Sequence, residues 1–154
     1  MVELHSGMYE LTIRPANAAD ASTIRRMIYQ ANINPTGLSW WRFVLAIDPE
    51  GNVIGCGQVK PHNDGSQELA SIAVLPDWRT KGVARQIILH LLDQHPGRLY
   101  LTCRSSLGPM YQKFGFRVLQ KSEMTPYFKR LSWIVAIINK LIRQPNILLV
   151  MRRN

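Results

Sequence analysis

The feature that most constrains the fold of this sequence is a strand, a tight turn and a helix in immediate succession. Residues 68–75 are largely apolar and suited to a β-strand, and Pro76 ends the run. After the turn, apolar residues recur at helical spacing until Pro96 and Gly97 end the pattern. The helical stripe consists of Val83, Ala84, Ile87, Ile88, Leu91 and Leu92. A buried strand next to an amphipathic helix predicts an α+β or α/β fold rather than an all-helical one.

The rest of the chain alternates between strand and helix signals, without an internal repeat or a linker. Further strands are expected at 11–14, 43–47, 53–59, 98–103, 116–119 and 147–151, and further helices over 21–31, 107–114 and about 125–143. This order favours the α+β class with one mixed sheet, in a single domain over residues 1–154. Two cysteines, Cys56 and Cys103, are too few for a disulfide framework. We therefore expect a reducing, cytoplasmic location.

The charge of the chain is strongly asymmetric. Residues 1–95 hold eight Lys and Arg against nine Asp and Glu, a net charge of −1, whereas residues 96–154 hold eleven against one, a net charge of +10. Such an excess fits a nucleic-acid face, a membrane-surface patch or a pocket for a polyanionic ligand. The basic residues are scattered over several elements without interleaved aromatic residues, so we expect no specific nucleic-acid partner.

The turn before the helix at Val83 carries a candidate phosphate site. Its sequence from Arg79 to Ala84 is R-T-K-G-V-A, and a helix N-terminus offers unpaired N–H groups and a positive dipole end. A second interpretation is structural, with Gly82 merely starting the helix and Ala84 packing on the sheet. The chain contains no Walker motif. Gly55-Cys56-Gly57 lacks the third glycine of a dinucleotide fingerprint and is better explained by a bulge or close packing.

Three short motifs, in the right order along residues 11–120, resemble the GNAT superfamily of acyl-CoA-dependent N-acyltransferases. The matches are Arg79, Gly82 and Ala84 in [QR]-x-x-G-x-[GA], Met110–Phe116 in Y-x-x-x-G-F, and Ile13–Ala16 with Asp20 at the family's start. Each motif alone is weak, and their combination is specific. The resemblance implies a GNAT-like domain with a mixed central sheet, a splayed strand pair and acetyl-CoA as co-substrate, without a metal.

By this resemblance, the strand and the turn bind the co-substrate. The backbone of Ile72, Ala73 and Val74 would pair with the pantetheine arm, and the N–H group of Val74 would polarise the thioester carbonyl. The pyrophosphate would be held by the N–H groups of Arg79, Thr80, Lys81, Gly82, Val83 and Ala84. The side chains of Arg79, Lys81 and Arg85 could add charge, or could simply be solvated.

The resemblance also assigns acid–base roles. Tyr111 matches the general acid that protonates the leaving CoA thiolate, although a tyrosine packed in the core is the alternative. Glu68 lies where some members carry a general base, and an exposed strand-end carboxylate is the alternative. Ser105 and Ser106 replace an asparagine that contacts the CoA arm in many members, which puts that contact in doubt.

The helix expected at 125–143 is an insertion relative to the common family core. At 100° per residue, one narrow stripe is mostly polar: Lys129, Ser132, Ala136, Asn139, Lys140 and Arg143. The remaining surface is apolar over about twice the width that packing on one sheet requires. The excess predicts contact with the acceptor pocket, a homodimer partner or a membrane surface, with deep burial as the alternative.

The remaining candidates favour structural roles. His5, His62, His90 and His95 lack metal-site spacing and are interpreted as surface histidines. Trp40 or Trp41 could line an acceptor pocket or pack in the core. The leading hypothesis is an N-acetyltransferase that transfers acetyl from acetyl-CoA to a primary amine, on a small molecule or a protein, by direct attack in a ternary complex. The alternatives are a non-catalytic CoA-binding sensor or scaffold, and a basic protein that binds nucleic acid or membrane surfaces.

Overall fold

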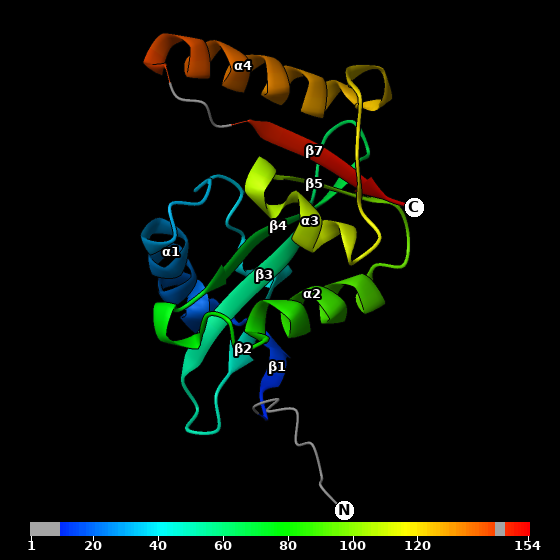
Figure 1. The fold of residues 1–154 in the computed structure, drawn as a ribbon. Helices are drawn as coiled ribbons and strands as arrows, with labels where there is room; N and C mark the ends of the chain where they lie inside the picture. The colour runs from blue at the N-terminus through cyan, green and yellow to red at the C-terminus, as the bar shows by residue number, and fades with distance from the viewer. Residues whose placement is uncertain (1–9, 144–146) are drawn as a thin grey trace, which may run out of the picture. The chain divides into compact units, whose positions relative to one another are not determined.

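A computed structural model describes residues 10–143 and 147–154 (Figure 1). The strands are β1 (Thr12–Pro15), β2 (Phe43–Ile47), β3 (Val53–Pro61), β4 (Gln67–Val74), β5 (Leu99–Arg104), β6 (Arg117–Val118) and β7 (Leu148–Arg153). The α-helices are α1 (Ala21–Gln30), α2 (Val83–Gln94), α3 (Gly108–Gln112) and α4 (Pro126–Ile142). The strands form one mixed sheet in the order β1-β2-β3-β4-β5-β7-β6, which confirms the predicted α+β class.

The chain divides into two compact units that are described separately below. The first comprises residues 10–59 and 71–94, and the second comprises residues 60–70, 95–143 and 147–154. Strand β4 runs from the second unit into the first, and the change of unit falls at Ser71.

The first unit contains an antiparallel meander covered by α1. Thr12 lies opposite Ile47 in the β1–β2 pair, and Phe43 lies opposite Gln58 in the β2–β3 pair. Asn17 and Asp20 form a capping box at the 3₁₀ turn (Ala18–Asp20) that leads into α1. Asp20 also accepts a hydrogen bond from Arg14 at 2.8 Å. The apolar face of α1 packs against the strands in a core of Ile24, Met27, Ile28, Phe43, Leu45, Cys56 and Ala73.

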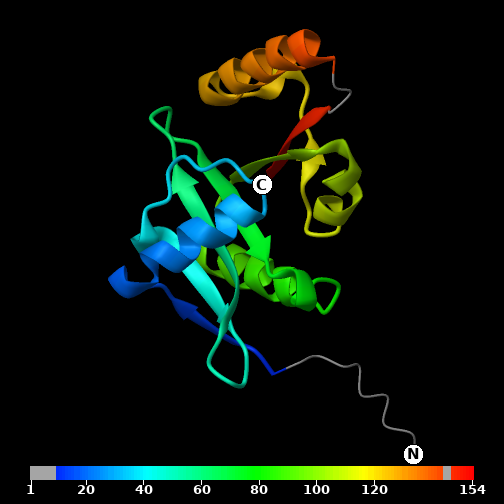
Figure 2. The ribbon, with the colours of Figure 1, turned by 90° about the vertical axis from the view of Figure 1, so that its left-hand side faces the viewer.

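Helix α2 lies on the opposite face of these strands, against the two glycines of β3 (Figure 2). A Cβ atom at Gly57 would lie 2.6 Å from Ile72 Cδ1 and 2.7 Å from Ile87 Cγ2, and one at Gly55 would lie 2.9 Å from Ile87 Cδ1. The glycines therefore allow the helix to approach the strand closely. This confirms close packing as the reason for Gly55 and Gly57.

The second unit is built on the antiparallel pair of β5 and β7. Tyr100 lies opposite Arg152 in this pair, and β4 runs parallel to β5 with Glu68 opposite Tyr100. The core of this unit consists of Tyr100, Leu119, Phe128 and Val150. Strand β6 is shorter than the predicted 116–119. The reason is that the N–H group of Phe116 donates to the Tyr111 carbonyl at the end of α3.

Candidate active site

The turn between β4 and α2 has an unusual backbone. Thr80 and Gly82 both have positive φ, at 63° and 80°. The left-handed region costs a residue with a Cβ roughly 1–2 kcal/mol, so the conformation at Thr80 is held by its surroundings. A Cβ atom at Gly82 would meet no atom within 4 Å. Glycine is therefore required there by backbone conformation rather than by protein packing, and space beside the backbone stays open.

Two cations of this turn have defined neighbours. Arg79 Nε donates to the Val74 carbonyl at 3.3 Å, which joins the turn to the end of β4. Lys81 Nζ lies 5.3 Å from the centre of the Trp78 ring, within the range of a cation–π interaction. The first N–H groups of α2 follow directly at Val83, and such groups have no intrahelical partner. The arrangement suits a phosphate group.

The three residues predicted to bind the pantetheine arm, Ile72, Ala73 and Val74, form the end of β4. Ala73 is buried in the core shared with α1, whereas Ile72 and Val74 are half-buried. One residue earlier, Ser71 has a φ of 60° and interrupts the extended backbone of the strand. Gln58 Nε2 donates to Ser71 Oγ at 2.8 Å, and both side chains are buried. The sequence analysis missed this irregularity, because no residue pattern marks a left-handed serine inside a strand.

Glu68, the predicted base, belongs to the second unit and is buried there. Its side chain is 5% exposed, and its Oε1 atom lies 3.2 Å from Nε2 of His62. The alternative of an exposed strand-end carboxylate is therefore wrong. The interpretation of His62 as a surface histidine is also wrong, because its side chain is only 10% exposed. The hairpin between β3 and β4 brings His62 back beside Glu68.

Aromatic rings of α4 hold this pair in place. The imidazole of His62 stacks on the Tyr127 ring at a centroid distance of 3.6 Å, and the edge of Phe128 lies 5.7 Å away. Phe128 stacks in turn on Tyr100, at 5.0 Å. Burial raises the pKa of Tyr127, and the negative charges of Glu68 and Asp64 add to the effect.

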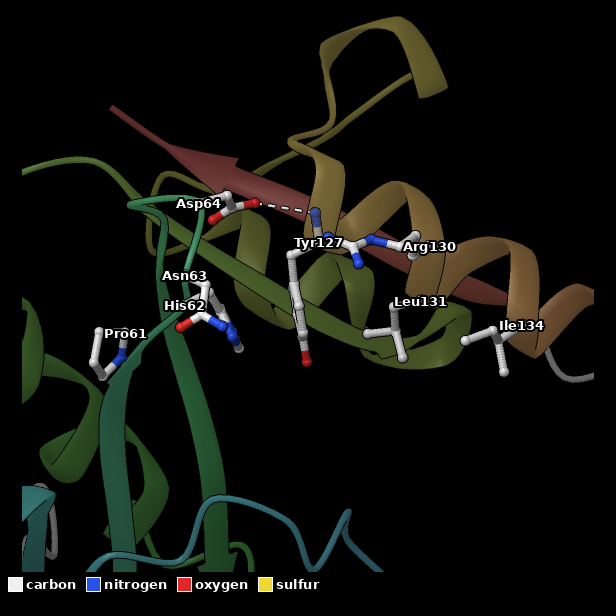
Figure 3. A pocket seen from close by; sticks show the side chains of 8 residues that line it. All are labelled: Pro61, His62, Asn63, Asp64, Tyr127, Arg130, Leu131 and Ile134. Atoms are coloured by element: carbon white, nitrogen blue, oxygen red, sulfur yellow. Dashed lines mark hydrogen bonds between the residues drawn. The ribbon is translucent and has the colours of Figure 1, made fainter.

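A pocket of about 400 Å³ opens between the β3–β4 turn and α4 (Figure 3). It is lined by Pro61, His62, Asn63, Asp64, Tyr127, Arg130, Leu131 and Ile134. Asp64 accepts a hydrogen bond at 3.0 Å from the backbone N–H of Tyr127, so the turn caps the first turn of α4. Burial alone would raise the pKa of Asp64, but hydrogen bonds from Ser66 and Tyr127 outweigh it and lower that pKa.

Tyr111 is buried in α3 of the second unit. Its ring lies 6.2 Å from Phe116 in an edge-to-face arrangement. Burial, with a contribution from the neighbouring Cys103 thiol, raises the pKa of Tyr111 to about 12. Ser105 and Ser106 are exposed in the 3₁₀ turn that leads into α3, and the N–H of Ser105 donates to the Ile147 carbonyl at 3.0 Å.

The predicted site residues thus belong to both units. The first holds Ile72–Val74 and Arg79–Arg85, where Arg79 contacts Val74. The second holds Glu68, Ser105, Ser106 and Tyr111, where Glu68 contacts His62. His90 and His95 are half-buried, and His5 lies outside the described residues. Over residues 10–143 and 147–154, no group of three His, Cys, Asp or Glu side chains is arranged to hold a metal ion.

Comparisons with solved structures show the same fold. N-acetylglutamate synthase from Neisseria gonorrhoeae, complexed with coenzyme A and N-acetyl-glutamate, aligns with a TM-score of 0.68 at 18% identity over 94% of this chain. This chain spans only 35% of the length of that protein. Rv2747 from Mycobacterium tuberculosis, in complex with CoA and NLQ, aligns with a TM-score of 0.68 at 19% identity and covers 92% of this chain and 98% of its own. Ard1 from Thermoplasma volcanium aligns with a TM-score of 0.64 at 14% identity over 93% and 96% of the two chains.

The sequence itself carries the family assignment. No curated protein matches the chain. The sequence model of the acetyltransferase (GNAT) domain matches residues 39–118, more than half of the 154 residues. That range contains β2, β3, β4, the turn at Gly82, α2 and Tyr111. The chain therefore belongs to the GNAT acetyltransferase family, whose general activity is acyl-CoA-dependent N-acyl transfer.

Proposed function

We propose that this protein transfers the acetyl group of acetyl-CoA to a primary amine by direct attack in a ternary complex. The amine nitrogen forms a bond to the thioester carbonyl carbon, the carbon–sulfur bond breaks, and the sulfur leaves with the bonding electrons. The nitrogen then loses a proton to a base. The observation that carries the proposal is the buried pair of Glu68 and His62, which opens through His62 on a pocket of acceptor size.

The residues of the first unit fit the co-substrate, which supplies an activated acyl thioester when bound. The open space beside Gly82 and the N–H groups at the start of α2 would accept the pyrophosphate. Arg79 holds the turn against β4, and Lys81 and Arg85 would add positive charge. The backbone N–H of Val74 would donate to the thioester oxygen, with Ile72 and Ala73 along the pantetheine arm.

Within the second unit, His62 takes the proton and Glu68 orients it. A carboxylate beside the imidazole favours the tautomer in which Nε2 carries the hydrogen and donates to Glu68. The other ring nitrogen is then a base, and stacking on Tyr127 fixes the ring plane. The buried carboxylate would stabilise the imidazolium that forms. This extends the predicted role of Glu68 from direct base to the partner of a base.

Tyr111 would act on the leaving thiolate while remaining a phenol. Its pKa of about 12 keeps it protonated at neutral pH. Full transfer of its proton to a thiolate of pKa about 8.5 would be uphill by about 5 kcal/mol. We therefore assign Tyr111 the donation of a hydrogen bond to the sulfur, with the proton ultimately coming from solvent.

The pocket indicates the class of acceptor. Leu131 and Ile134 offer an apolar wall, and Arg130 offers a positive charge at its edge. An amine that carries a neutral or acidic group is favoured over a polyamine, because the second half of the chain has a net charge of +10.

Two measurements test the proposal. CoA should raise the melting temperature, and Gly82→Glu should abolish the shift. Gly51→Glu is the matched control, since Gly51 also has a positive φ of 88° and open space. Acetyl-CoA should then release free thiol with an amine panel, at a rate that His62→Gln lowers while the melting-temperature shift with CoA is retained. CoA binding without turnover on any amine would instead indicate a sensor or scaffold.

A further inference from the structure

Helix α4 turns an apolar face away from β7 of the second unit. Phe128 is its buried residue, at the end nearest the β3–β4 turn. The large apolar residues that follow are exposed over the rest of the helix. Those on the side opposite Phe128 form what we call the α4 apolar face: Trp133, Ile134, Ile137 and Leu141. Two of them, Trp133 and Leu141, are 66% and 78% exposed, so the alternative of deep burial is wrong.

The helical geometry explains this exposure. At 100° per residue, Phe128, Leu131 and Val135 lie on one side, which is the less exposed side and packs against β7 (Figure 1). Asn139 and Ser132 of the predicted polar stripe are also half-buried on that side. Trp133, Ile137 and Leu141 lie on the opposite side. The polar stripe therefore flanks the packed side, and the apolar face is left toward solvent.

Cations lie along one edge of the α4 apolar face and within it. Lys129 and Lys140 lie along one edge of it, and both are exposed. Arg130 lies between Trp133 and Leu141 around the helix, and Arg143 follows its last turn. The helix contains no acidic residue, and only Glu123 is acidic in residues 96–154. An occupant of this face must combine an apolar region with negative charge.

We propose that α4 docks this protein on the surface of an anionic lipid bilayer, with the helix axis in the plane of the headgroups. Trp133, Ile137 and Leu141 would enter the boundary between headgroups and acyl chains, and the lysines would contact anionic headgroups. At 17 residues the helix is about 25 Å long. Neither α4 nor any other helix in the described part of the chain can cross a membrane, so the contact is with one leaflet.

A second copy of the chain fits this face less well. A symmetric dimer through α4 would bring Lys129, Lys140 and Arg130 of both copies into one interface without an acidic partner. Like charges in a desolvated contact oppose association, whereas the same charges favour an anionic surface. The proposal does not depend on acyl transfer and is tested without acetyl-CoA.

The test is flotation of the full chain with vesicles made of equal parts phosphatidylcholine and phosphatidylserine. Binding is expected to these vesicles, with weak binding to phosphatidylcholine alone and loss at high salt. Trp133→Ser should lower the partition coefficient about tenfold. Trp41→Ser is the matched control, because Trp41 is 65% exposed in the first unit and should have no effect. Lys140→Gln should lower the partition coefficient about fivefold, whereas Arg26→Gln, at an exposed position of α1, should leave it unchanged.

A second measurement locates the contact. Brominated lipids should quench part of the tryptophan fluorescence, and Trp133→Phe should remove that part while retaining flotation. Absence of binding to the mixed vesicles, or equal losses in the Trp133 and Trp41 variants, would overturn the proposal. So would a concentration-dependent dimer in analytical ultracentrifugation that Trp133→Ser disrupts in the absence of vesicle binding.

Discussion

Gly57→Ala should destabilise the first unit, because a single methyl group would enter a filled space. The new Cβ atom would lie 2.6 Å from Ile72 Cδ1, 2.7 Å from Ile87 Cγ2 and 3.2 Å from Leu91 Cδ1. Ordinary contacts between carbon atoms are about 3.5–4.0 Å, so two side chains must each move by about 1 Å. Overpacking of this size costs about 1–3 kcal/mol, although flexible side-chain ends can relieve part of it.

The assay is urea denaturation of the variant beside Gly97→Ala. Gly97 has no atom within 4 Å of a built Cβ and has no positive φ, so that control should be neutral or slightly stabilising. We expect a lower midpoint for Gly57→Ala at an unchanged slope, and a melting temperature lower by roughly 2–4 °C per kcal/mol. Equal midpoints for the two variants would refute the conclusion that α2 is seated on β3 through its glycines.

Two further predictions concern the second unit. Tyr111→Phe should slow turnover by about tenfold to a hundredfold with CoA binding unchanged, because one hydrogen bond to a charged sulfur is lost; a loss of several thousandfold in steady-state rate would contradict this role. Asp64→Ala should lower the unfolding free energy by about 1 kcal/mol at neutral pH, because the cap of α4 is lost. The loss stays this small because solvent screens the exposed carboxylate. Asn63→Ala is the control and should cost little. The pKa of Asp64 is lowered in the folded state, so its contribution is present above the unfolded value of about 3.9 and disappears as the pH falls through the folded value. Denaturation curves of parent and variant should therefore converge in acid.

Much of the fold was predictable because local patterns and tertiary packing agree. The strands β2 and β3 and the apolar stripe of α2 each follow a spacing that their environment reinforces. The family motif matched by Arg79, Gly82 and Ala84 likewise predicted the position of the turn at Gly82.

The remainder depends on long-range contacts that leave no local pattern. His62 gains its importance only from the hairpin that returns Glu68 beside it and from Tyr127, which lies far along the chain. The left-handed Ser71 is held by Gln58 from the neighbouring strand. The face that α4 presents to solvent was ambiguous from sequence, because the helix is apolar over most of its circumference.

The cap of α4 by Asp64 has a consequence for the order of folding. The carboxylate and the N–H it accepts are 63 residues apart, so the start of this helix is completed only after the β3–β4 turn has formed and a long loop has closed. An isolated peptide of 17 residues without its cap is only marginally helical in water. We therefore expect α4, the last helix in the described part of the chain, to form late, with its apolar residues lacking a fixed orientation in the early stages of folding. Interactions made after the transition state govern unfolding rather than folding, so we expect loss of the Asp64 cap to speed unfolding more than it slows folding.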